Sequence, residues 1–193
     1  MATGALDANG IWIYGEDDSE ATFSALLNKL GSSTSTEIGD VNTTRKGGQV
    51  VSTAKKDTTT ITTTTPSSFL SVTITPKATT SKILIIAQVV TSFTNQEAFL
   101  RLSGGNAVTY IGDTAGSRVR GVTQPAENAG GSRATTQTLI YLDSPATTSA
   151  TTYNVQGWVV SGGSLYVNRS FNDIDNANFI RGASSITAIE VLA

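Results

Sequence analysis

The stretch TLIYLDSPATTSATTYNVQGWVV, residues 138–160, decides the fold of this chain. Two runs rich in β-branched and aromatic residues, Thr138–Leu142 and Thr151–Val160, flank Ser144-Pro145 and a tract of small polar residues. Such runs are typical of strands joined by a surface turn. Neither of the alternating faces of the second run is wholly polar. We therefore expect it to lie inside a sandwich or at a subunit contact, with the other strands laid down around this pair.

The same twofold period runs through residues 69–193. Gly, Pro, Asn and Ser separate about eight expected strands, which are Leu70–Thr75, Lys82–Thr91, Ala98–Ser103, Ala107–Gly112, Arg133–Leu142, Thr151–Val160, Leu165–Asn168 and Ile186–Leu192. Short strands at this spacing predict an all-β, antiparallel sandwich, and about eight of them fit a jelly roll. Two long loops, 112–132 and 170–182, interrupt the strands, and loops of that length are usually functional or disordered.

The first 31 residues have a different pattern. The apolar segment GIWIYG, residues 10–15, is followed by acidic residues that suit the start of a helix. One apolar stripe at helical spacing comes next, made by Phe23, Leu26, Leu27 and Leu30. We therefore expect an amphipathic helix over Asp18–Leu30, ended by Gly31. Its stripe must be buried against copies of the same chain, against another protein or against the β-domain.

Residues 32–68 are rich in Thr and Ser and poor in large apolar side chains. Such a segment cannot form a core of its own, so we expect a linker or stalk, or else a disordered spacer. Thr58–Thr65 is β-branched throughout and is the part of this segment most suited to an extended conformation.

The composition argues against several classes of protein. The chain has no Cys and no His, which excludes disulfides, thiolate or imidazole metal sites and the Ser-His-Asp triad. A net charge of −2 argues against a nucleic-acid binder. No apolar run is long enough to cross a membrane, and the N-terminus lacks the pattern of a secretory signal. We expect no enzymatic activity, because no carboxylate pair has a recognisable glycosidase context. The sequence predicts no cofactor and no metal site.

Candidate binding residues lie in the two long loops. Arg118 and Arg120 in the first loop offer planar guanidinium groups that stack and bind carboxylates. The second loop contributes Phe171, Asn172 and Asp173, and Phe171 and Phe179 are its aromatics. Residues 172–176 are similar to the start of a calcium loop, but the glycine and the distant glutamate of that motif are missing. A polar surface loop is the expectation there.

Two parts of the chain resemble bacteriophage structural proteins. The segment GIWIYGEDDSEATFSALLNKLGSS, residues 10–33, resembles the opening of minor tail or fibre components. The later part resembles phage fibre and tip domains of jelly-roll type, on SVTITPKATTSKILIIAQV (71–89), SRATTQTLIYLDSPATTSATTYNVQ (132–156), LYVNRS (165–170) and RGASSITAIEVL (181–192). Neither part carries catalytic residues in that family.

This resemblance implies a homotrimeric appendage on the virion, on the exterior of tail or capsid, assembled in the host cytoplasm. Its N-terminus would attach to other virion proteins through Ile11, Trp12, Ile13 and Tyr14. The helix stripe and the apolar positions around Trp158 would be buried between trimer mates. The jelly roll, residues 69–193, would bind a host-surface glycan or protein as a tail fibre or tip adhesin. The alternative is a capsid decoration or head-fibre protein with no dedicated receptor.

Overall fold

The computed structural model describes residues 5–6, 12–13, 28–30, 48–94, 97–125 and 133–192, and the chain divides into two compact units, Met1–Lys46 and Gly47–Ala193. In the first unit β1 (Ala5–Leu6) pairs with β2 (Trp12–Ile13) in an antiparallel ladder. Residues 28–30 form a helical turn in which Leu30 is exposed. The other residues predicted for attachment and for the helix stripe lie outside the described residues: Ile11, Tyr14, Phe23, Leu26 and Leu27.

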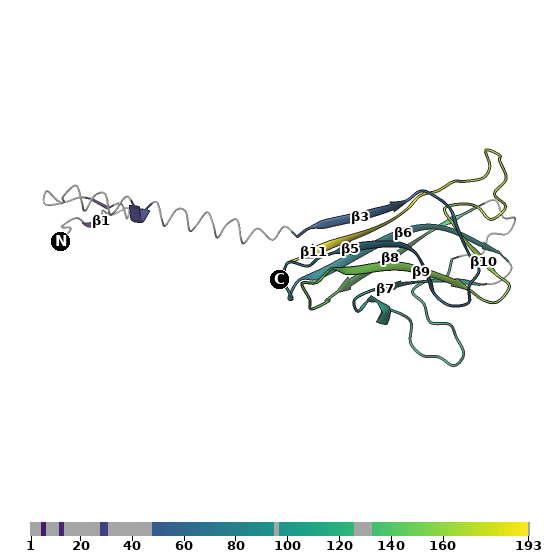
Figure 1. Cartoon of the computed structure of the whole chain (residues 1–193), viewed down its shortest axis with the longest axis horizontal. Coiled ribbons are helices and arrows are strands. Elements are labelled where there is room, and N and C mark those ends of the chain that lie inside the picture. The colour runs from purple at the N-terminus through teal and green to yellow at the C-terminus, as the bar shows by residue number, and fades with distance from the viewer. Residues whose placement is uncertain are drawn as a thin grey trace. The chain divides into compact units, whose positions relative to one another are not determined.

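The second unit is an antiparallel β-sandwich (Figure 1). The larger sheet contains, in spatial order, β3 (Val50–Lys55), β11 (Ser184–Val191), β6 (Lys82–Thr94) and β8 (Thr135–Asp143). Beyond β11 on the same edge of β6 lie β10 (Ser164–Val167) and then β4 (Thr59–Ile61). The smaller sheet contains β5 (Ser67–Ile74), β9 (Thr151–Val159) and β7 (Ala98–Ser103).

A short segment at Thr123 completes the smaller sheet. The Leu100 N–H donates to the Thr123 carbonyl at 2.9 Å, and the Val122 N–H donates to the Leu100 carbonyl at 2.8 Å, so residues 121–123 run beside β7. Without β4 and β10, the strands in chain order are β3, β5, β6, β7, residues 121–123, β8, β9 and β11. The larger sheet then contains β3, β11, β6 and β8, which are the first, eighth, third and sixth of this series. The smaller holds the second, seventh, fourth and fifth, which is the interleaved order of a jelly roll. The predicted fold class is confirmed.

The two runs that decide the fold are strands, but they do not pair with each other. β8 pairs with β6, and β9 pairs with β5 and β7, so the connection 144–150 crosses from one sheet to the other. Hairpin loops usually have roughly two to five residues. A longer connection lets the chain cross the ~10 Å between packed sheets. The prediction that residues 138–142 and 151–160 form strands is therefore confirmed, but the expectation that they form a pair is wrong.

The sandwich begins earlier than the sequence suggested. β3 and β4 lie within residues 32–68, the predicted linker, and pair with β11 and β10. They carry few large apolar side chains because an edge position needs only one face to contact the core. The predicted strand Ala107–Gly112 is instead a 3₁₀ turn, η1 (Ala107–Thr109). Gly104 and Gly105 precede it with φ values of 100° and 49°, which end the extended conformation.

The core lies between the two sheets. Alternate residues of each strand point inward and are buried, as Ile83 and Ile85 on β6 and Tyr153 and Val155 on β9 illustrate. Gly157 on β9 lies close to the opposite sheet: a Cβ there would be 2.6 Å from Leu165 Cδ2, so a larger residue would force the Leu165 side chain to move. Close packing of this kind orders the strands and leaves the loops to carry function.

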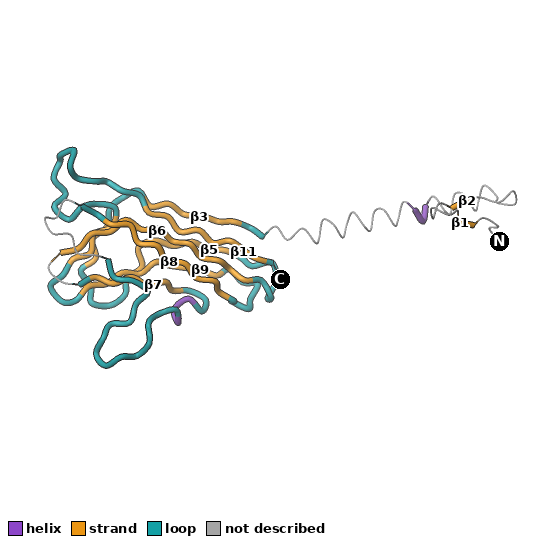
Figure 2. The backbone as a smooth tube through the Cα atoms, turned by 180° about the vertical axis from the view of Figure 1, so that it is seen from behind, coloured by secondary structure: helices purple, strands orange, loops and turns teal. Residues whose placement is uncertain are grey.

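The two ends of the sandwich differ. The chain enters at Gly48 and ends β11 at the same end, where the Glu190 N–H donates to the Gln49 carbonyl at 2.9 Å. Residues 56–66, which include β4, and residues 160–183, which include β10, lie at the opposite end, which we call the distal end (Figures 1 and 2). The most extended of these is residues 170–182, the distal loop.

Candidate binding site at the distal end

Asn168 holds the base of the distal loop. It is completely buried and adopts a left-handed φ of 62° directly after β10. Its side-chain amide donates to the carbonyls of Lys55 at 2.9 Å and Asp57 at 3.0 Å, and its Oδ1 accepts from the Ser184 hydroxyl at 2.5 Å. Its backbone N–H donates to the Val90 carbonyl at 2.8 Å. A fully bonded buried polar group of this kind fixes where the loop starts.

Two arginines and one aspartate close the loop. Arg169 and Arg181 face each other in an isolated antiparallel bridge. Asp173, with φ of 48°, places Oδ1 2.8 Å from the Arg181 guanidinium and Oδ2 3.6 Å from that of Arg169. Asp173 was predicted as a receptor contact. The structure places it between two cations of its own chain, where it ties the loop tip to the loop base.

Phe171 and Asn172 follow this bridge. The Arg169 guanidinium lies 4.1 Å over the Tyr166 ring, and the Phe171 ring stacks at 6.4 Å from Tyr166. Arg169 also donates to the Phe171 carbonyl at 3.0 Å, so the stack is held from both sides. Phe171 is half-buried and Asn172 is exposed. The structure thus brings together three residues that the sequence predicted for one site, namely Phe171, Asn172 and Asp173.

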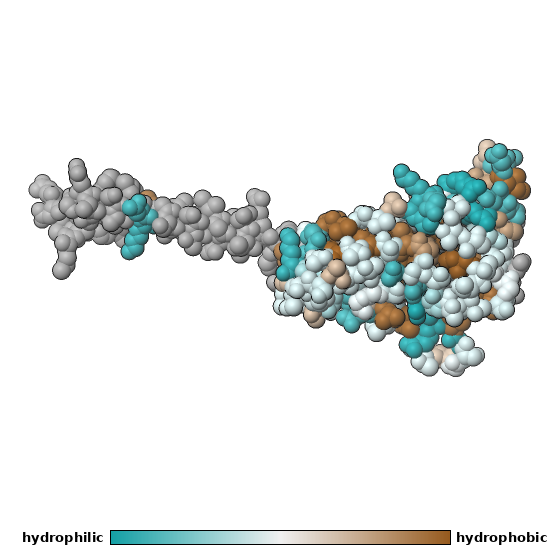
Figure 3. Space-filling view, in the orientation of Figure 1, coloured by the Kyte–Doolittle hydropathy of each residue, from teal (hydrophilic) through white to brown (hydrophobic). Residues whose placement is uncertain are grey.

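The tip of the distal loop encloses a hollow of about 190 Å³. Its lining residues are Asp173, Ile174, Asp175, Asn176, Phe179, Ile180 and Arg181. Hydrogen bonds within the loop shape it: the Phe179 N–H donates to the Asn176 carbonyl at 3.0 Å, and the Asn178 N–H donates to Asn176 Oδ1 at 2.9 Å. Figure 3 shows the tip as hydrophobic and hydrophilic surface side by side. The hollow is therefore formed by local turns of the loop itself.

The hollow combines an apolar lining with two charged side chains that can form further hydrogen bonds. The Asp175 carboxylate accepts no hydrogen bond from any described residue, and the Arg181 side chain is 62% exposed. A carboxylate accepts and a guanidinium donates several hydrogen bonds, while Phe179, Ile174 and Ile180 offer apolar contact. This set matches a sugar ring, which has an apolar face and hydroxyl groups around its edge.

Arg118 and Arg120 lie elsewhere. They belong to residues 112–121, the flap, which projects beside β7 on the opposite side of the sandwich from the distal loop (Figure 1). The Arg120 Nε donates to the Gly112 carbonyl at 2.7 Å, and Arg118 Nη1 donates to the Ala115 carbonyl at 3.3 Å. Both are exposed, and the structure does not bring them together with the distal loop.

The flap also covers Trp158. This side chain points away from the core but is only 7% exposed, stacked on Phe99 at 5.6 Å with Arg101 at 5.8 Å. Gly121 of the flap packs against the edge of the Trp158 ring. The expectation that copies of the chain shelter this position is corrected: the chain's own flap does so.

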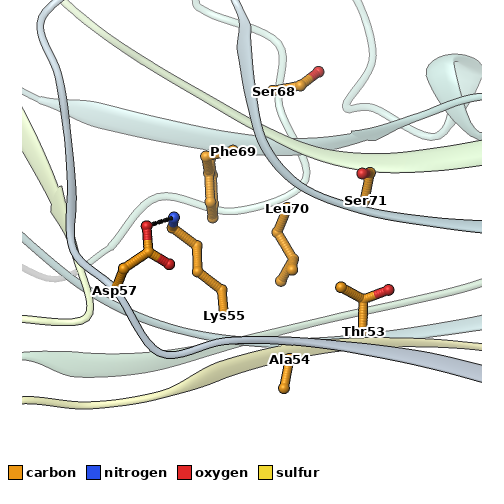
Figure 4. A pocket seen from close by; sticks show the side chains of 8 residues that line it. All are labelled: Thr53, Ala54, Lys55, Asp57, Ser68, Phe69, Leu70 and Ser71. Atoms are coloured by element: carbon orange, nitrogen blue, oxygen red, sulfur yellow. Dashed lines mark hydrogen bonds and ion pairs between the residues drawn. The ribbon is translucent and has the colours of Figure 1, made fainter.

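A second hollow of about 370 Å³ lies between β3 and β5, where the edges of the two sheets diverge (Figure 4). Its only acidic group is Asp57, 2.7 Å from Lys55 Nζ. The hydrogen bond from Lys55 lowers the pKa of Asp57, which keeps it ionised. Hydroxyl groups of Thr53, Ser68 and Ser71 complete the lining.

Metal-binding clusters and membrane-spanning helices were the other features sought among the described residues. Within the described ranges, no cluster of three or more Asp, Glu, His or Cys side chains is placed to hold a metal ion. In the same part of the chain no helix has the length and apolar character needed to span a membrane.

Three residues at the distal loop were not predicted as binding residues, namely Tyr166, Asp175 and Arg181. Tyr166 is half-buried at an outward position of β10. Arg169 and Arg181 flank the loop in sequence with Asp173 between them, and this charge pattern was the available signal. The antiparallel bridge between Arg169 and Arg181 shows that the two arginines lie close together, which the sequence does not indicate.

No protein-family model and no curated protein matches the sequence. Two solved structures match the chain weakly. The infectious bursal disease virus VP2 subviral particle is 10% identical, with a TM-score of 0.36, and the match covers 75% of this chain and 41% of that chain. The Gx strain of the same virus is 16% identical, with a TM-score of 0.35, covering 76% and 37%. The chain spans less than half of either protein. The jelly-roll assignment rests on the strand pairing of this chain and not on these matches.

Proposed function

We propose that the protein is a virion surface appendage that attaches to the host cell, and that its distal loop binds a carbohydrate of the host surface. The observation that carries this proposal is the hollow at the loop tip, with its apolar lining beside Asp175 and Arg181. The resemblance to phage fibre and tip domains supplies the virion context and remains a prediction.

The direction of the chain supports this assignment. The segment predicted to attach to the particle joins the β-domain at Gly48, at the end where β11 also finishes. The distal loop lies at the other end of the sandwich (Figure 2). A domain tethered through Gly48 therefore has its distal loop farthest from the tether, where a host surface is met first.

The volume of the hollow limits the size of the ligand that it can bind. Pockets for drug-sized ligands usually enclose ~300–1,000 Å³, whereas this hollow of about 190 Å³ is suited to a single sugar unit. One such contact is weak. Several copies on one appendage raise the overall affinity by about 10² to 10⁴ when they engage the same surface. The homotrimer that the sequence resemblance implies provides this multivalency.

The test is binding of fluorescently labelled full-length protein to an array of bacterial surface polysaccharides. The double variant Asp175→Asn with Arg181→Gln removes two of the three charges that line the hollow, together with the ion pair of Arg181 with Asp173, and both altered side chains are exposed. Arg118→Gln with Arg120→Gln in the flap is the matched control.

We expect saturable binding that falls at least tenfold in the hollow variant and stays unchanged in the flap variant. Loss of binding in the flap variant alone would contradict the proposed site. Labelled antibody on virions gives the second readout: protein on the capsid together with unchanged adsorption in the hollow variant would favour a decoration role and overturn the adhesin.

A further inference from the structure

The second hollow lies where the sandwich is open between the edge strands β3 and β5. The two strands meet near the entry of the chain, where the Gln49 side chain donates to the Thr75 carbonyl, and they diverge toward Lys55 and Ser68 (Figure 4). The space between them, about 370 Å³, is roughly twice that of the hollow in the distal loop. It falls within the ~300–1,000 Å³ that is usual for small-molecule sites.

The wall formed by β3 is polar at positions that face the core. In the ladder with β11, Thr53 lies beside Ile186 and Lys55 beside Ser184, and both β11 residues are buried. Neighbours in a ladder share a face, so Thr53 and Lys55 also point between the sheets. The Lys55 side chain is only 13% exposed. Where a sandwich normally continues its apolar core, this one therefore presents a hydroxyl and an ammonium group.

The wall formed by β5 contains a β-bulge at Phe69. Ser68 pairs with Gln156 and Leu70 pairs with Val155, so Phe69 has no partner on β9. A bulge bends its strand locally and changes the direction of a side chain. Phe69 is half-buried, and Figure 4 shows its ring directed toward β3. The bulge therefore gives the hollow an aromatic wall opposite the polar one.

The charged pair on β3 can form further hydrogen bonds. Lys55 Nζ donates to Asp57 Oδ2 at 2.7 Å, and no described residue accepts from the other two N–H groups of this ammonium. The Asp57 side chain is 75% exposed, so its carboxylate can accept from a ligand. The two charges cancel, and the hollow therefore combines a donor and an acceptor without net charge.

The backbone of this wall is held from inside the domain. The buried Asn168 amide donates to the carbonyls of Lys55 and Asp57, at 2.9 Å and 3.0 Å. These bonds fix the turn that places the two charged side chains. A site whose groups are positioned before the ligand arrives loses less conformational entropy on binding.

We propose that the second hollow binds a disaccharide unit of a neutral polysaccharide and is a separate site from the distal loop. The Phe69 ring offers a flat apolar surface to the apolar face of one sugar. Lys55 donates to, and Asp57 accepts from, hydroxyl groups, which can do both. The volume leaves room for a second sugar beside the hydroxyl groups of Thr53 and Ser71.

This site is independent of the proposed function. The two hollows share no lining residue, so either can bind a ligand without the other. A lysine that points inward on an edge strand can also prevent that strand from pairing with another chain. Such protection accounts for Lys55, but it requires neither the aromatic ring aimed by the bulge nor the hydroxyl groups around it.

The first test is amide NMR of isotope-labelled full-length protein with four neutral disaccharides: cellobiose, lactose, maltose and diacetylchitobiose. We expect at least one of them, at about millimolar concentration, to shift the amides of residues 53–57 and 68–71 until they saturate. If none of the four does so, Lys55 only protects the edge strand and the proposal is overturned. Shifts confined to residues 173–181 overturn it as well, because they assign the ligand to the distal loop.

The second test compares Phe69→Leu with Phe99→Leu. Leucine keeps an apolar side chain but removes the flat ring, and Phe99 is a half-buried phenylalanine of the same sheet that lies outside the hollow. For the disaccharide found in the first test, Phe69→Leu should raise the dissociation constant about tenfold, and Phe99→Leu should leave it unchanged.

Asp57→Asn serves where Phe69→Leu fails to fold, because it alters an exposed side chain. It should also weaken binding about tenfold, and Asp113→Asn, at an exposed position of the flap, is its control. Binding that neither Phe69→Leu nor Asp57→Asn weakens would overturn the site. The distal loop is tested with other variants and other amides, so each of the two proposals can fail alone.

Discussion

The phenol hydroxyl of Tyr153 on β9 donates a 2.6 Å hydrogen bond to Asp143 Oδ2 on β8, and so joins the two sheets across the core. Both residues are fully buried. Asp143 also accepts a longer bond, 3.3 Å, from the Asn106 N–H before η1. Burial first, and then the neighbouring carboxylate, raise the pKa of Tyr153. The pair fixes the position of β8 relative to β9 across the core.

Replacing Tyr153 by Phe should therefore destabilise the domain. The carboxylate of Asp143 would remain buried with the Asn106 N–H as its one donor among the described residues, at a cost of about 1.5–3 kcal/mol in the free energy of unfolding. Urea denaturation measures this loss. Tyr110→Phe removes an exposed phenol and should change stability by less than ~0.5 kcal/mol. Equal effects of the two substitutions would contradict a structural role for the bond.

Acid should destabilise the β-domain through Glu190. Burial alone would raise the pKa of this carboxyl, but hydrogen bonds from the Lys77 N–H and from Gln49 outweigh it and lower the pKa below the ordinary value of 4.5. Above about pH 4.5 the group is ionised in both states, so its contribution is complete. As the pH falls through the lower, folded-state pKa, the contribution is lost.

Thermal unfolding from pH 7 to pH 3 checks this expectation. Glu190→Gln should be less stable than the wild type at pH 7 by about 1–3 kcal/mol and should lose less on acidification. A variant with the same slope of stability against pH as the wild type would show that other carboxylates dominate the acid response.

Alanine substitutions at Gly104 and Gly162 should distinguish the stability cost of steric crowding from that of backbone strain. Gly104 has φ of 100°, and a Cβ there would lie 2.0 Å from the Thr152 carbonyl oxygen; Gly162 has φ of 85° with open space around it. Gly162→Ala should cost only the left-handed strain, about 1 kcal/mol. Gly104→Ala should cost at least about 3 kcal/mol, because backbone must move as well. Chemical denaturation of both variants compares them, and equal losses would argue against crowding at Gly104.

The period of two predicted the fold class well. β7 begins and ends as predicted, and the expected strands around 82–91, 133–142, 151–160 and 186–192 exist with shifted ends. The partners of each strand were not predictable, since alternation shows which face is buried but not which sheet the strand joins. β8 and β9 illustrate this, because they are neighbours in sequence and lie in different sheets.

The candidate site was predictable only in outline. The length of the distal loop and its mixture of Phe, Asn and Asp indicated a functional surface. The hollow depends on contacts between residues on the two arms of the loop, such as Asp173 with Arg169 and Arg181, which no local pattern shows. Arg118 and Arg120 were predicted as binding residues because they lie in the other long loop, which the structure places beside the smaller sheet.

The most direct test of the account is competition for adsorption. Purified full-length protein is added to host cells before the virions, and the adsorption rate is measured as its concentration rises. We predict that the wild-type protein slows adsorption until it saturates, and that Asp175→Asn with Arg181→Gln needs at least tenfold more protein for the same effect. Adsorption that is unchanged at saturating wild-type protein would contradict attachment through the distal loop.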